Sequence, residues 1–354
     1  MPPRRRKRLD PAVFNLPVEE LKEGRYTDRY AVRARETLLA DGRSPRALVQ
    51  VSCTRDAFIG GIDEAIAVLR LCADDWSALT VHAMYEGDRV DAFNTVMTIE
   101  GPYEQFGYLD TVFLGVLTRG TGIVTSMRGI VDAARPKPVI FFPARQDHWR
   151  LQPGDGFAAM VAGASGVSTL AQSARGGSIP VETVSHSLIA AYGGDTVKAT
   201  QKLAERIPED AQLIALVDYR NDSATTSVAV ARALEHRLWG VRLDTPDTIV
   251  DKSILAHMGA FVPTGVNEQL VWNVRNALDA EGFGDVKIVV SGSLTRQKIA
   301  FFEEEGVPVD AYMVGGALLD ERIDFVADVV SIDGKTQAKA GRAQRENERM
   351  ERVK

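Results

Sequence analysis

The chain has 354 residues, which is enough for two domains of ordinary size, and its 45% hydrophobic and 25% charged residues are typical of a globular protein. A formal net charge of −6 argues against the basic surface of a nucleic-acid-binding protein, and no apolar run approaches the ~20 residues that span a bilayer. No apolar segment follows the basic N-terminus, so we expect a cytoplasmic protein without a secretory signal. The two cysteines, Cys53 and Cys72, are too few for a structural zinc site and are expected to be reduced thiols.

Both ends of the chain are poor in apolar residues. Residues 1–8 form a basic arm, which could contact an anionic partner but is expected to be solvated and flexible. Its cations are Arg4, Arg5, Arg6, Lys7 and Arg8. Residues 334–354 mix Lys, Arg and Glu and offer almost nothing to bury, so they predict a frayed helix or a disordered, charged tail.

Residues 9–117 predict an α+β domain. Apolar residues between positions 59 and 69 recur at helical spacing and indicate one amphipathic helix. Two strand-like runs, at 78–85 and 91–99, flank a Gly-containing turn at 86–88 and predict a hairpin. A helix beside antiparallel strands is typical of the α+β class.

Residues 118–333 predict an α/β barrel. A helical pattern over 112–134, interrupted at 119–122, leads into a repeated unit. Short apolar runs recur at 139–142, 166–170, 179–184, 213–217, 241–243, 260–262, 288–290 and 311–314. Helical patterns separate most of these runs, most clearly at 222–238, 265–280 and 295–305. Apolar strands that alternate with helices are typical of a parallel sheet, and about seven or eight such units favour a compact barrel over an open sheet.

In a β/α barrel the active site lies at the carboxyl ends of the strands, because the loops that lead into the helices gather there. Polar residues and glycines that follow the apolar runs are therefore candidate site residues: Arg145, His186, Asp218, Asp244, Ser291, Gly292, Gly315 and Gly316. Glycine lets backbone N–H groups approach an anion at a helix N-terminus. Because barrels commonly bind phosphate after their final two strands, the last four of these residues predict a phosphate site, although either glycine segment alone could be a structural turn.

Asp218 and Asp244 end neighbouring runs and allow two interpretations. Their carboxylates could bind Mg²⁺ or ribose hydroxyls, or each could cap the helix that follows it. His186 could be a general base or a nucleophile toward phosphorus, or an ordinary hydrogen-bonded side chain. Arg145 could pair with a substrate carboxylate or phosphate in a fork geometry. Their shared position at strand ends favours a functional site.

Taken together, these segments resemble the nicotinate and quinolinate phosphoribosyltransferases, the type II phosphoribosyltransferases, over nearly the whole chain. The most specific stretches are Thr27-Asp28-Arg29-Tyr30, Gly240-Val241-Arg242-Leu243-Asp244-Thr245, Lys287-Ile288-Val289-Val290-Ser291-Gly292-Ser293 and Val309-Asp310-Ala311-Tyr312-Met313-Val314-Gly315-Gly316. The nicotinate branch fits better, through the first of these and through residues 183–189. The resemblance implies an N-terminal α+β sandwich-like domain joined to an incomplete, roughly seven-stranded TIM-like α/β barrel. It also implies a homodimer with shared active sites.

The resemblance further implies transfer of a phosphoribosyl group from phosphoribosyl pyrophosphate to the ring nitrogen of nicotinate. Mg²⁺ is the implied metal, ATP is a possible co-substrate through a phosphorylated histidine, and no structural zinc is implied. The 5′-phosphate would be held by Ser291, Gly292, Gly315 and Gly316. The ribose hydroxyls and Mg²⁺-pyrophosphate would be held by Asp218 and Asp244.

The remaining roles implied by the resemblance concern the pyridine ring and the phosphohistidine. Arg145 would contact the pyridine carboxylate or the pyrophosphate, and Tyr30 would stack on the ring. Thr183 and Arg242 would also bind substrate. His186 would be the phosphorylated residue.

Other readings stay open at this point. Glu182 stands where the family usually has glycine, which predicts a crowded site and leaves room for a catalytically silent relative that binds a nucleotide or phosphosugar. Quinolinate is the nearer alternative substrate, and its second carboxylate would need cations near Arg145, for which Arg150 and Lys137 are the candidates. A barrel aldolase or isomerase would need a lysine at a strand end, and the strand ends above supply none.

Overall fold

The computed structural model describes residues 7–178, 180–259 and 261–354, and the chain divides into two compact units. One unit comprises Met1–Thr125 and Asp320–Lys354, and the other comprises Ser126–Leu319. These limits differ from the predicted ones for two reasons. Helix α5 (Asp110–Ala134) runs without a break past residue 117, and the chain after Leu319 returns to the first unit as strands.

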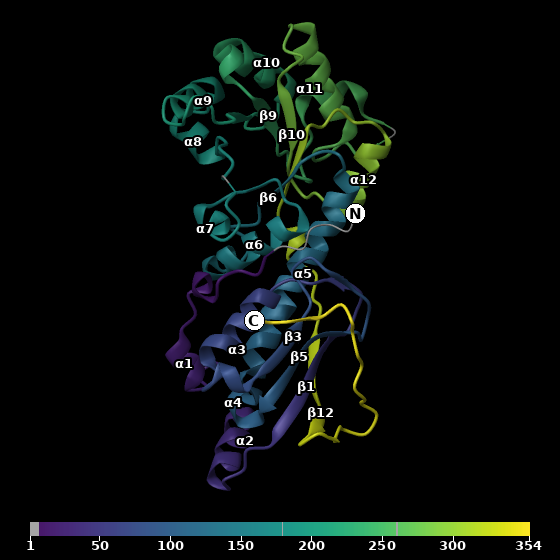
Figure 1. Cartoon of the computed structure of the whole chain (residues 1–354). Coiled ribbons are helices and arrows are strands. Elements are labelled where there is room, and N and C mark those ends of the chain that lie inside the picture. The colour runs from purple at the N-terminus through teal and green to yellow at the C-terminus, as the bar shows by residue number, and fades with distance from the viewer. Residues whose placement is uncertain (1–6, 179, 260) are drawn as a thin grey trace. The chain divides into compact units, whose positions relative to one another are not determined.

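The first unit is an antiparallel sheet with helices packed against one face (Figure 1). Its strands follow the spatial order β13 (Lys335–Thr336), β12 (Phe325–Ile332), β1 (Arg46–Cys53), β5 (Thr95–Pro102), β3 (Thr80–Ala83) and β14 (Glu351–Arg352). The predicted hairpin is confirmed, since β3 and β5 pair antiparallel with Val81 opposite Ile99. Along the chain, β4 (Arg89–Val90) lies between β3 and β5, and it pairs with β2 (Ala57–Phe58) in a separate small sheet.

Helix α3 (Ile62–Cys72) and the first half of α5 cover this sheet. Ile62 and Leu69 of α3 are buried, as their spacing predicts, and Phe113 of α5 joins the same core. The two helices meet at glycines, because a Cβ on Gly120 would lie only 2.6 Å from the nitrogen of Gly61. The predicted interruption of α5 around Gly120 is therefore wrong: the glycine serves a close contact and the helix continues through it. The unit also contains α1 (Val18–Lys22), α2 (Arg29–Ala40) and α4 (Tyr103–Phe106).

Residues 334–354 cross the opposite face of the sheet and end as its edge strand. Successive residues of a strand point to opposite faces, so Gln50 faces away from the core that Val51 joins. The Gln50 side chain donates to the carbonyl oxygen of Ala343 (3.0 Å) and accepts from the amide of Arg345 (2.9 Å). The predicted frayed helix or disordered tail is therefore wrong, because polar side chains of the sheet bind this segment and its Met350 and Val353 pack against the core.

The second unit is built on a parallel sheet. Its strands follow the order β7 (Gly166–Val167), β6 (Val139–Phe141), β11 (Ala311–Val314), β10 (Lys287–Val290), β9 (Gly240–Leu243) and β8 (Ile214–Leu216). Single parallel bridges join Pro180 to Val167 and Thr183 to Ile214, so residues 180–183 link the two edge strands as a seventh segment. Six strands and one segment held by single bridges thus agree with the roughly seven-stranded barrel that the family resemblance implies. The predicted strand at 260–262 is wrong for Phe261 and Val262, which are not in a strand, and residue 260 lies outside the described residues.

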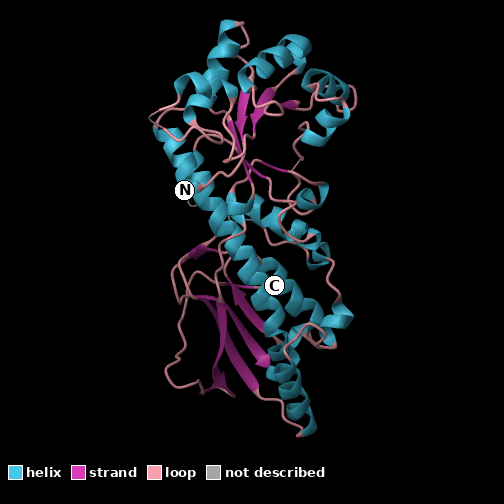
Figure 2. Ribbon diagram, turned by 180° about the vertical axis from the view of Figure 1, so that it is seen from behind, coloured by secondary structure: helices cyan, strands magenta, loops and turns pink. Residues whose placement is uncertain are grey.

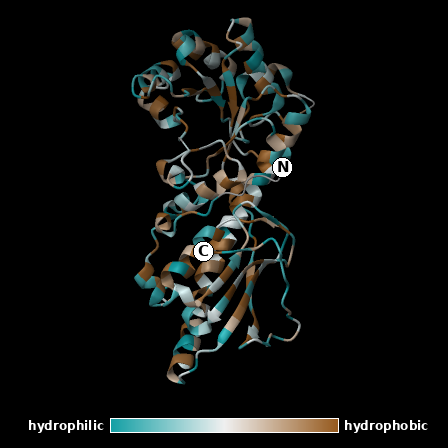
Figure 3. Cartoon of the chain, in the orientation of Figure 1, coloured by the Kyte–Doolittle hydropathy of each residue, from teal (hydrophilic) through white to brown (hydrophobic). Residues whose placement is uncertain are grey.

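Helices surround this sheet, as Figure 2 shows from behind. They are α6 (Gln152–Ala162), α7 (Leu170–Ser173), α8 (His186–Ala191), α9 (Thr196–Ala204), α10 (Ser223–Leu234), α11 (Glu268–Ala280) and α12 (Arg296–Glu304). The helices predicted at 222–238, 265–280 and 295–305 are confirmed as the last three. In Figure 3 the strands of the parallel sheet are largely brown, as expected of strands buried on both faces. None of the helices in the residues that the structure describes could serve as a membrane-spanning segment.

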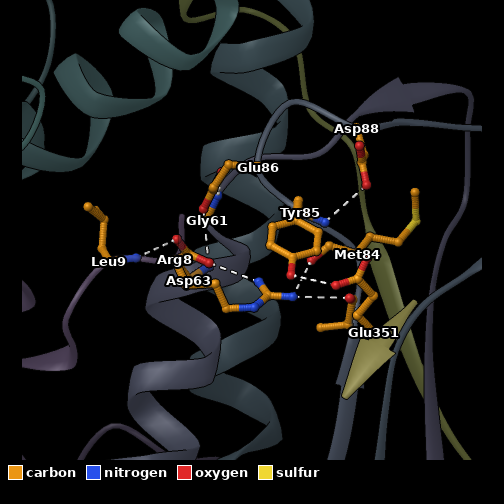
Figure 4. Close-up of polar contacts among 10 residues, drawn as sticks. Arg8, Leu9, Gly61, Asp63, Met84, Tyr85, Glu86, Asp88 and Glu351 are labelled. Atoms are coloured by element: carbon orange, nitrogen blue, oxygen red, sulfur yellow. Dashed lines mark hydrogen bonds and ion pairs between the residues drawn. The ribbon is translucent and has the colours of Figure 1, made fainter. Parts of the chain in front are cut away.

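The N-terminal arm is anchored at Arg8 (Figure 4). The Arg8 guanidinium lies over the Tyr85 ring, 4.1 Å from its centre, and pairs with Asp63 through an Nη1–Oδ1 contact of 2.9 Å. The amide of Leu9 donates to the other oxygen of Asp63, also at 2.9 Å. The prediction of a solvated arm is therefore wrong for Arg8, because a buried carboxylate binds it. Residues 1–6 lie outside the described ranges.

A second buried carboxylate, that of Glu86, lies beside this ion pair. Its two oxygens accept from the amides of Asp63 and Gly61, each at 3.1 Å, and thereby cap the N-terminus of α3. Burial and the charge of Asp63 raise the pKa of Glu86 to about 8, although the two amides and Arg8 oppose the shift. Glu86 therefore carries a proton at neutral pH.

Raising the pH should weaken the first unit through this group. The native state holds a proton that the unfolded chain releases between pH 4.5 and about 8. Glu86 should therefore lower the free energy of unfolding by about 1.4 kcal/mol for each pH unit in that window. In denaturant titrations Glu86→Gln should remove this slope, and the exposed control Glu23→Gln should retain it. Equal slopes in the wild type and Glu86→Gln would contradict the prediction.

Candidate functional site

Polar side chains gather inside the carboxyl end of the barrel. In the register of the parallel sheet, Arg242 stands between Leu216 of β8 and Val289 of β10, so the three residues share one face. This face is the interior, because Val289 packs there with Ile140 and Met313. Side chains alternate along a strand, so the residues two positions further on face the interior as well. These are Asp218, Asp244 and Ser291.

Asp218 is hydrogen-bonded to His186. Its Oδ1 lies 2.9 Å from His186 Nε2, with the carboxylate buried and the imidazole half exposed. Residues 180–183 bridge to β8 and so bring His186 to this end of the barrel, where the Ser185 hydroxyl caps α8. Burial raises the pKa of Asp218, the neighbouring His186 opposes that shift, and the negative charge of Asp244 adds to it.

Asp244 is joined to the loop after β10. The Ser291 hydroxyl donates to Asp244 Oδ1 at 2.7 Å. Gly292 follows in the left-handed conformation, with φ +79°, and a Cβ there would lie 3.4 Å from the carbonyl oxygen of Thr245. The glycine therefore lets the β10 loop turn back tightly beside the aspartate.

Arg242 is a buried cation with unused hydrogen-bond donors. It is 4% exposed, and its Nε and Nη1 find no hydrogen-bond partner among the described residues. Its ion pair with Asp244 is long, with 3.6 Å between Nη2 and Oδ2. Burial lowers the pKa of Arg242, Asp244 and Asp218 oppose that shift, and the positive charge of Arg145 adds to it. Because buried donors are normally satisfied, these two nitrogens point to an acceptor from outside the fold.

Neither aspartate caps the helix that follows it. Helix α10 begins after Asp222, and its first amide, that of Ser223, donates to Asp251. Helix α11 is capped by Asn267, whose side chain accepts from the amide of Leu270. The capping interpretation of Asp218 and Asp244 is therefore wrong, and both side chains are directed instead to the barrel interior.

The second predicted phosphate segment follows β11, the strand beside β10. Gly315 and Gly316 begin a short 3₁₀ helix, Gly316–Leu318. A Cβ on Gly315 would lie 2.7 Å from Gln146 Oε1, so a larger residue there would displace the Gln146 side chain, which comes from the loop after β6. The two predicted segments are thus on neighbouring strands, and Gln146 lies against one of them.

Comparison with known proteins identifies the family. A family model described as Quinolinate phosphoribosyl transferase, N-terminal domain, matches residues 28–120. A solved structure of nicotinate-nucleotide pyrophosphorylase from Pyrococcus furiosus is 33% identical, covers 96% of this chain and 85% of that chain, and has a TM-score of 0.80. The chain belongs to the nicotinate and quinolinate phosphoribosyltransferase family.

Members of both branches of this phosphoribosyltransferase family resemble the chain. Nicotinate phosphoribosyltransferase pncB1 of Mycobacterium tuberculosis is 29% identical over 263 residues, which is 70% of this chain and 53% of that protein. The chain thus spans about half the length of the curated relatives it matches. The structure of human nicotinic acid phosphoribosyltransferase shares the fold, with 17% identity, a TM-score of 0.70, and coverage of 88% of this chain and 76% of that chain. The predicted fold class is confirmed.

Tyr30 belongs to α2 of the first unit, where it is 71% exposed. Of the two candidate cations, Lys137 is not brought to the carboxyl end of the barrel. Lys137 precedes β6 and therefore lies at the opposite, amino end of the strands, where it pairs with Glu303 at 2.8 Å. The suggestion that Lys137 lies near Arg145 is therefore wrong. Arg150 does follow β6, and its guanidinium lies 5.1 Å from the centre of the Trp149 ring.

Glu182 does not crowd the interior. Val181 packs with the barrel core, and Thr183 shares its side of the segment because side chains alternate. Glu182 points to the other side and is exposed, while its carbonyl oxygen accepts from the amide of Ile214. The sequence analysis identified Glu182 as unusual but did not predict which way its side chain points. That depends on which residues of the segment 180–183 face the interior, and only single bridges to the neighbouring strands fix this segment.

The sequence analysis did not single out three residues at this end of the barrel: Phe142, Thr245 and Gln146. The centre of the Phe142 ring lies 5.4 Å from the Arg242 guanidinium. Thr245 is fully buried, and its hydroxyl finds no partner within the described part of the chain. Gln146 lies against Gly315. Strand parity could have found Phe142, which is two residues beyond the interior Ile140.

Replacing Arg242 should cost the unliganded protein less stability than replacing Arg275, whose guanidinium has more partners. Arg242→Met removes donors that are not satisfied, although it also takes the cation away from Asp244 and Asp218, so in chemical denaturation the free energy of unfolding should fall by less than in the Arg275 variant. Arg275→Met is the matched control, because the Arg275 guanidinium donates to the carbonyl oxygens of Val286 (2.9 Å) and Phe283 (3.0 Å). Its removal should cost about 1–3 kcal/mol. A loss of stability in Arg242→Met as large as that of the control would overturn this reading.

Proposed function

We propose that this chain transfers a phosphoribosyl group from phosphoribosyl pyrophosphate to the ring nitrogen of nicotinate, which gives nicotinate mononucleotide and pyrophosphate. The observation that carries the proposal is the buried Arg242 guanidinium, whose Nε and Nη1 have no hydrogen-bond partner among the described residues. A buried guanidinium with free donors is suited to bind the oxygens of an anion such as a carboxylate. The names of the relatives, nicotinate phosphoribosyltransferase and nicotinate-nucleotide pyrophosphorylase, support the same nucleotide product.

In this proposal Arg242 binds the pyridine carboxylate. The Phe142 ring lies close enough to Arg242 to offer a flat apolar surface to the pyridine ring. Arg145 and Thr183 complete the substrate residues at the same end of the barrel. The exposed ring of Tyr30 would stack on a substrate bound by a second copy of the chain, in a homodimer with shared sites.

The sugar and phosphates would bind at the neighbouring strand ends. Ser291, Gly292, Gly315 and Gly316 would hold the 5′-phosphate through backbone N–H groups and the serine hydroxyl. Asp218 and Asp244 would hold the ribose hydroxyls and Mg²⁺, for which carboxylate oxygens are suitable ligands. Bound Mg²⁺ would offset the charge that develops on the departing pyrophosphate. The two carboxylates would stabilise positive charge on the ribosyl carbon.

His186 is the residue that would couple the reaction to ATP. Asp218 engages its Nε2, which leaves Nδ1 as the nitrogen able to accept a phosphoryl group. Glu182 is directed away from the interior, so it does not oppose a phosphate on His186 by crowding.

Quinolinate is the second candidate acceptor. The match of residues 28–120 to the N-terminal domain of quinolinate phosphoribosyl transferase favours it, as does Arg145, a second cation close to Arg242. Lys137 cannot serve as a further cation at this site, because it lies at the other end of the barrel.

Product formation tests this function directly. The wild-type chain, supplied with phosphoribosyl pyrophosphate and Mg²⁺, should form nicotinate mononucleotide faster from nicotinate than from quinolinate, and ATP should increase the yield. Asp244→Asn should lower kcat by about 100-fold or more, since it removes a charge beside the reacting carbon. Asp285→Asn, which changes an exposed residue at the amino end of β10, should leave kcat unchanged. No mononucleotide from either acid would refute the proposal.

A further inference from the structure

One buried carboxylate, that of Asp251, joins the loops that follow β8 and β9. Asp251 is fully buried. Its Oδ2 accepts from both the amide (2.9 Å) and the hydroxyl (2.7 Å) of Ser223, and its Oδ1 accepts from the amide of Ser253 (3.0 Å). Three donors from two segments thus satisfy a charge that would otherwise be costly to bury.

The contact with Ser223 replaces a missing helix cap. Ser223 is the first residue of α10, and the preceding Asp222 makes no side-chain cap hydrogen bond within the described residues. Asp251, 28 residues further along the chain, accepts from the free amide instead. A negative charge at this place is also favoured by the helix dipole. Because Asp251 belongs to the loop after β9, this cap connects that loop to the loop after β8, which a cap from Asp222 would not do.

A second contact runs beside the first. The amide of Lys252 donates to the carbonyl oxygen of Asn221 at 2.7 Å, and the amide of Asn221 donates to the carbonyl oxygen of Asp218 at 2.8 Å. Asn221 adopts a left-handed conformation with φ +47°, so the turn that carries Asp218 is tight. On the far side, the carbonyl oxygen of Ser253 accepts from the side chain of Asn273 in α11 at 2.9 Å. Asp251 therefore lies at the joint between the Asp218 turn, the β9 loop and α11.

We propose that Asp251 is a positioning residue that holds the turn carrying Asp218 against the loop that begins at Asp244. The proposal rests on the function proposed above, in which these two aspartates act on one ribosyl group. Charged groups at a reacting centre must be held to within a fraction of an ångström, and a displacement of about 1 Å can cost on the order of 100-fold in rate. Asp251 touches neither aspartate and acts through the backbone that carries them.

The test replaces Asp251 by asparagine and measures two quantities. Asp251→Asn keeps the size of the side chain but replaces one acceptor oxygen by an NH₂ group, so it cannot satisfy both Ser223 and Ser253. The matched control is Asn267→Ala, which also removes a buried helix cap from the loop between β9 and α11. Asn267 caps α11, so this change leaves the contact between the β9 loop and α10 in place. The two quantities are hydrogen exchange at individual amides and the separate values of kcat and KM for nicotinate.

We expect the amides of Asn221 and Lys252 to exchange at least tenfold faster in Asp251→Asn and to be unchanged in Asn267→Ala. We expect kcat to fall at least tenfold in Asp251→Asn, with KM for nicotinate within twofold of the wild type. Unchanged exchange at Asn221 would overturn the proposal, and so would an equal loss of kcat in both variants at the same temperature. Hydrogen exchange measures the contact between the two loops even if the wild type forms no mononucleotide. Failure of the proposed function is therefore distinguished from failure of the proposed role of Asp251.

Discussion

The buried guanidinium of Arg242 is the group around which the barrel end is organised. A cation in a barrel interior is unfavourable unless negative charge and hydrogen-bond acceptors surround it. Asp244 and Asp218 supply the charge from two strands, but neither satisfies the donors fully. Asp244 stays 3.6 Å away and is engaged by Ser291, while Asp218 is engaged by His186. The fold thereby keeps Nε and Nη1 of Arg242 available to a ligand.

This arrangement follows from the parity and register of a parallel sheet. Because neighbouring strands pair in register, residues from β8, β9 and β10 that are far apart in the sequence face the same interior. The loops that continue from these strands then need to be fixed relative to one another. Ser291 fixes β10 to β9, and Asp251 joins the β9 loop to the start of α10. The precision of the site thus rests on buried polar contacts between loops as well as on the strands.

Local patterns predicted much of the fold and the candidate site. A short apolar run followed by a polar residue or a glycine is a local signal, and it found Asp218, Asp244 and Ser291 without any knowledge of packing. Predictions that depended on distant partners fared worse. Gly120 was expected to break a helix but meets Gly61 across a helix contact, and the polar C-terminal tail was expected to be disordered but binds polar side chains of the sheet.

The sequence by itself determined most of the repeated strands of the second unit and its last three helices, the family, and the residue types at the strand ends, because these depend on hydrophobic periodicity and on motifs within a few residues. The tertiary structure alone decided which strand-end residues meet. It separated Lys137 from Arg145, turned Glu182 away from the interior, and left two donors of Arg242 without a protein partner. The physical reason is that strand parity, strand direction and hydrogen-bond satisfaction are properties of residues far apart in the chain, which no local pattern encodes.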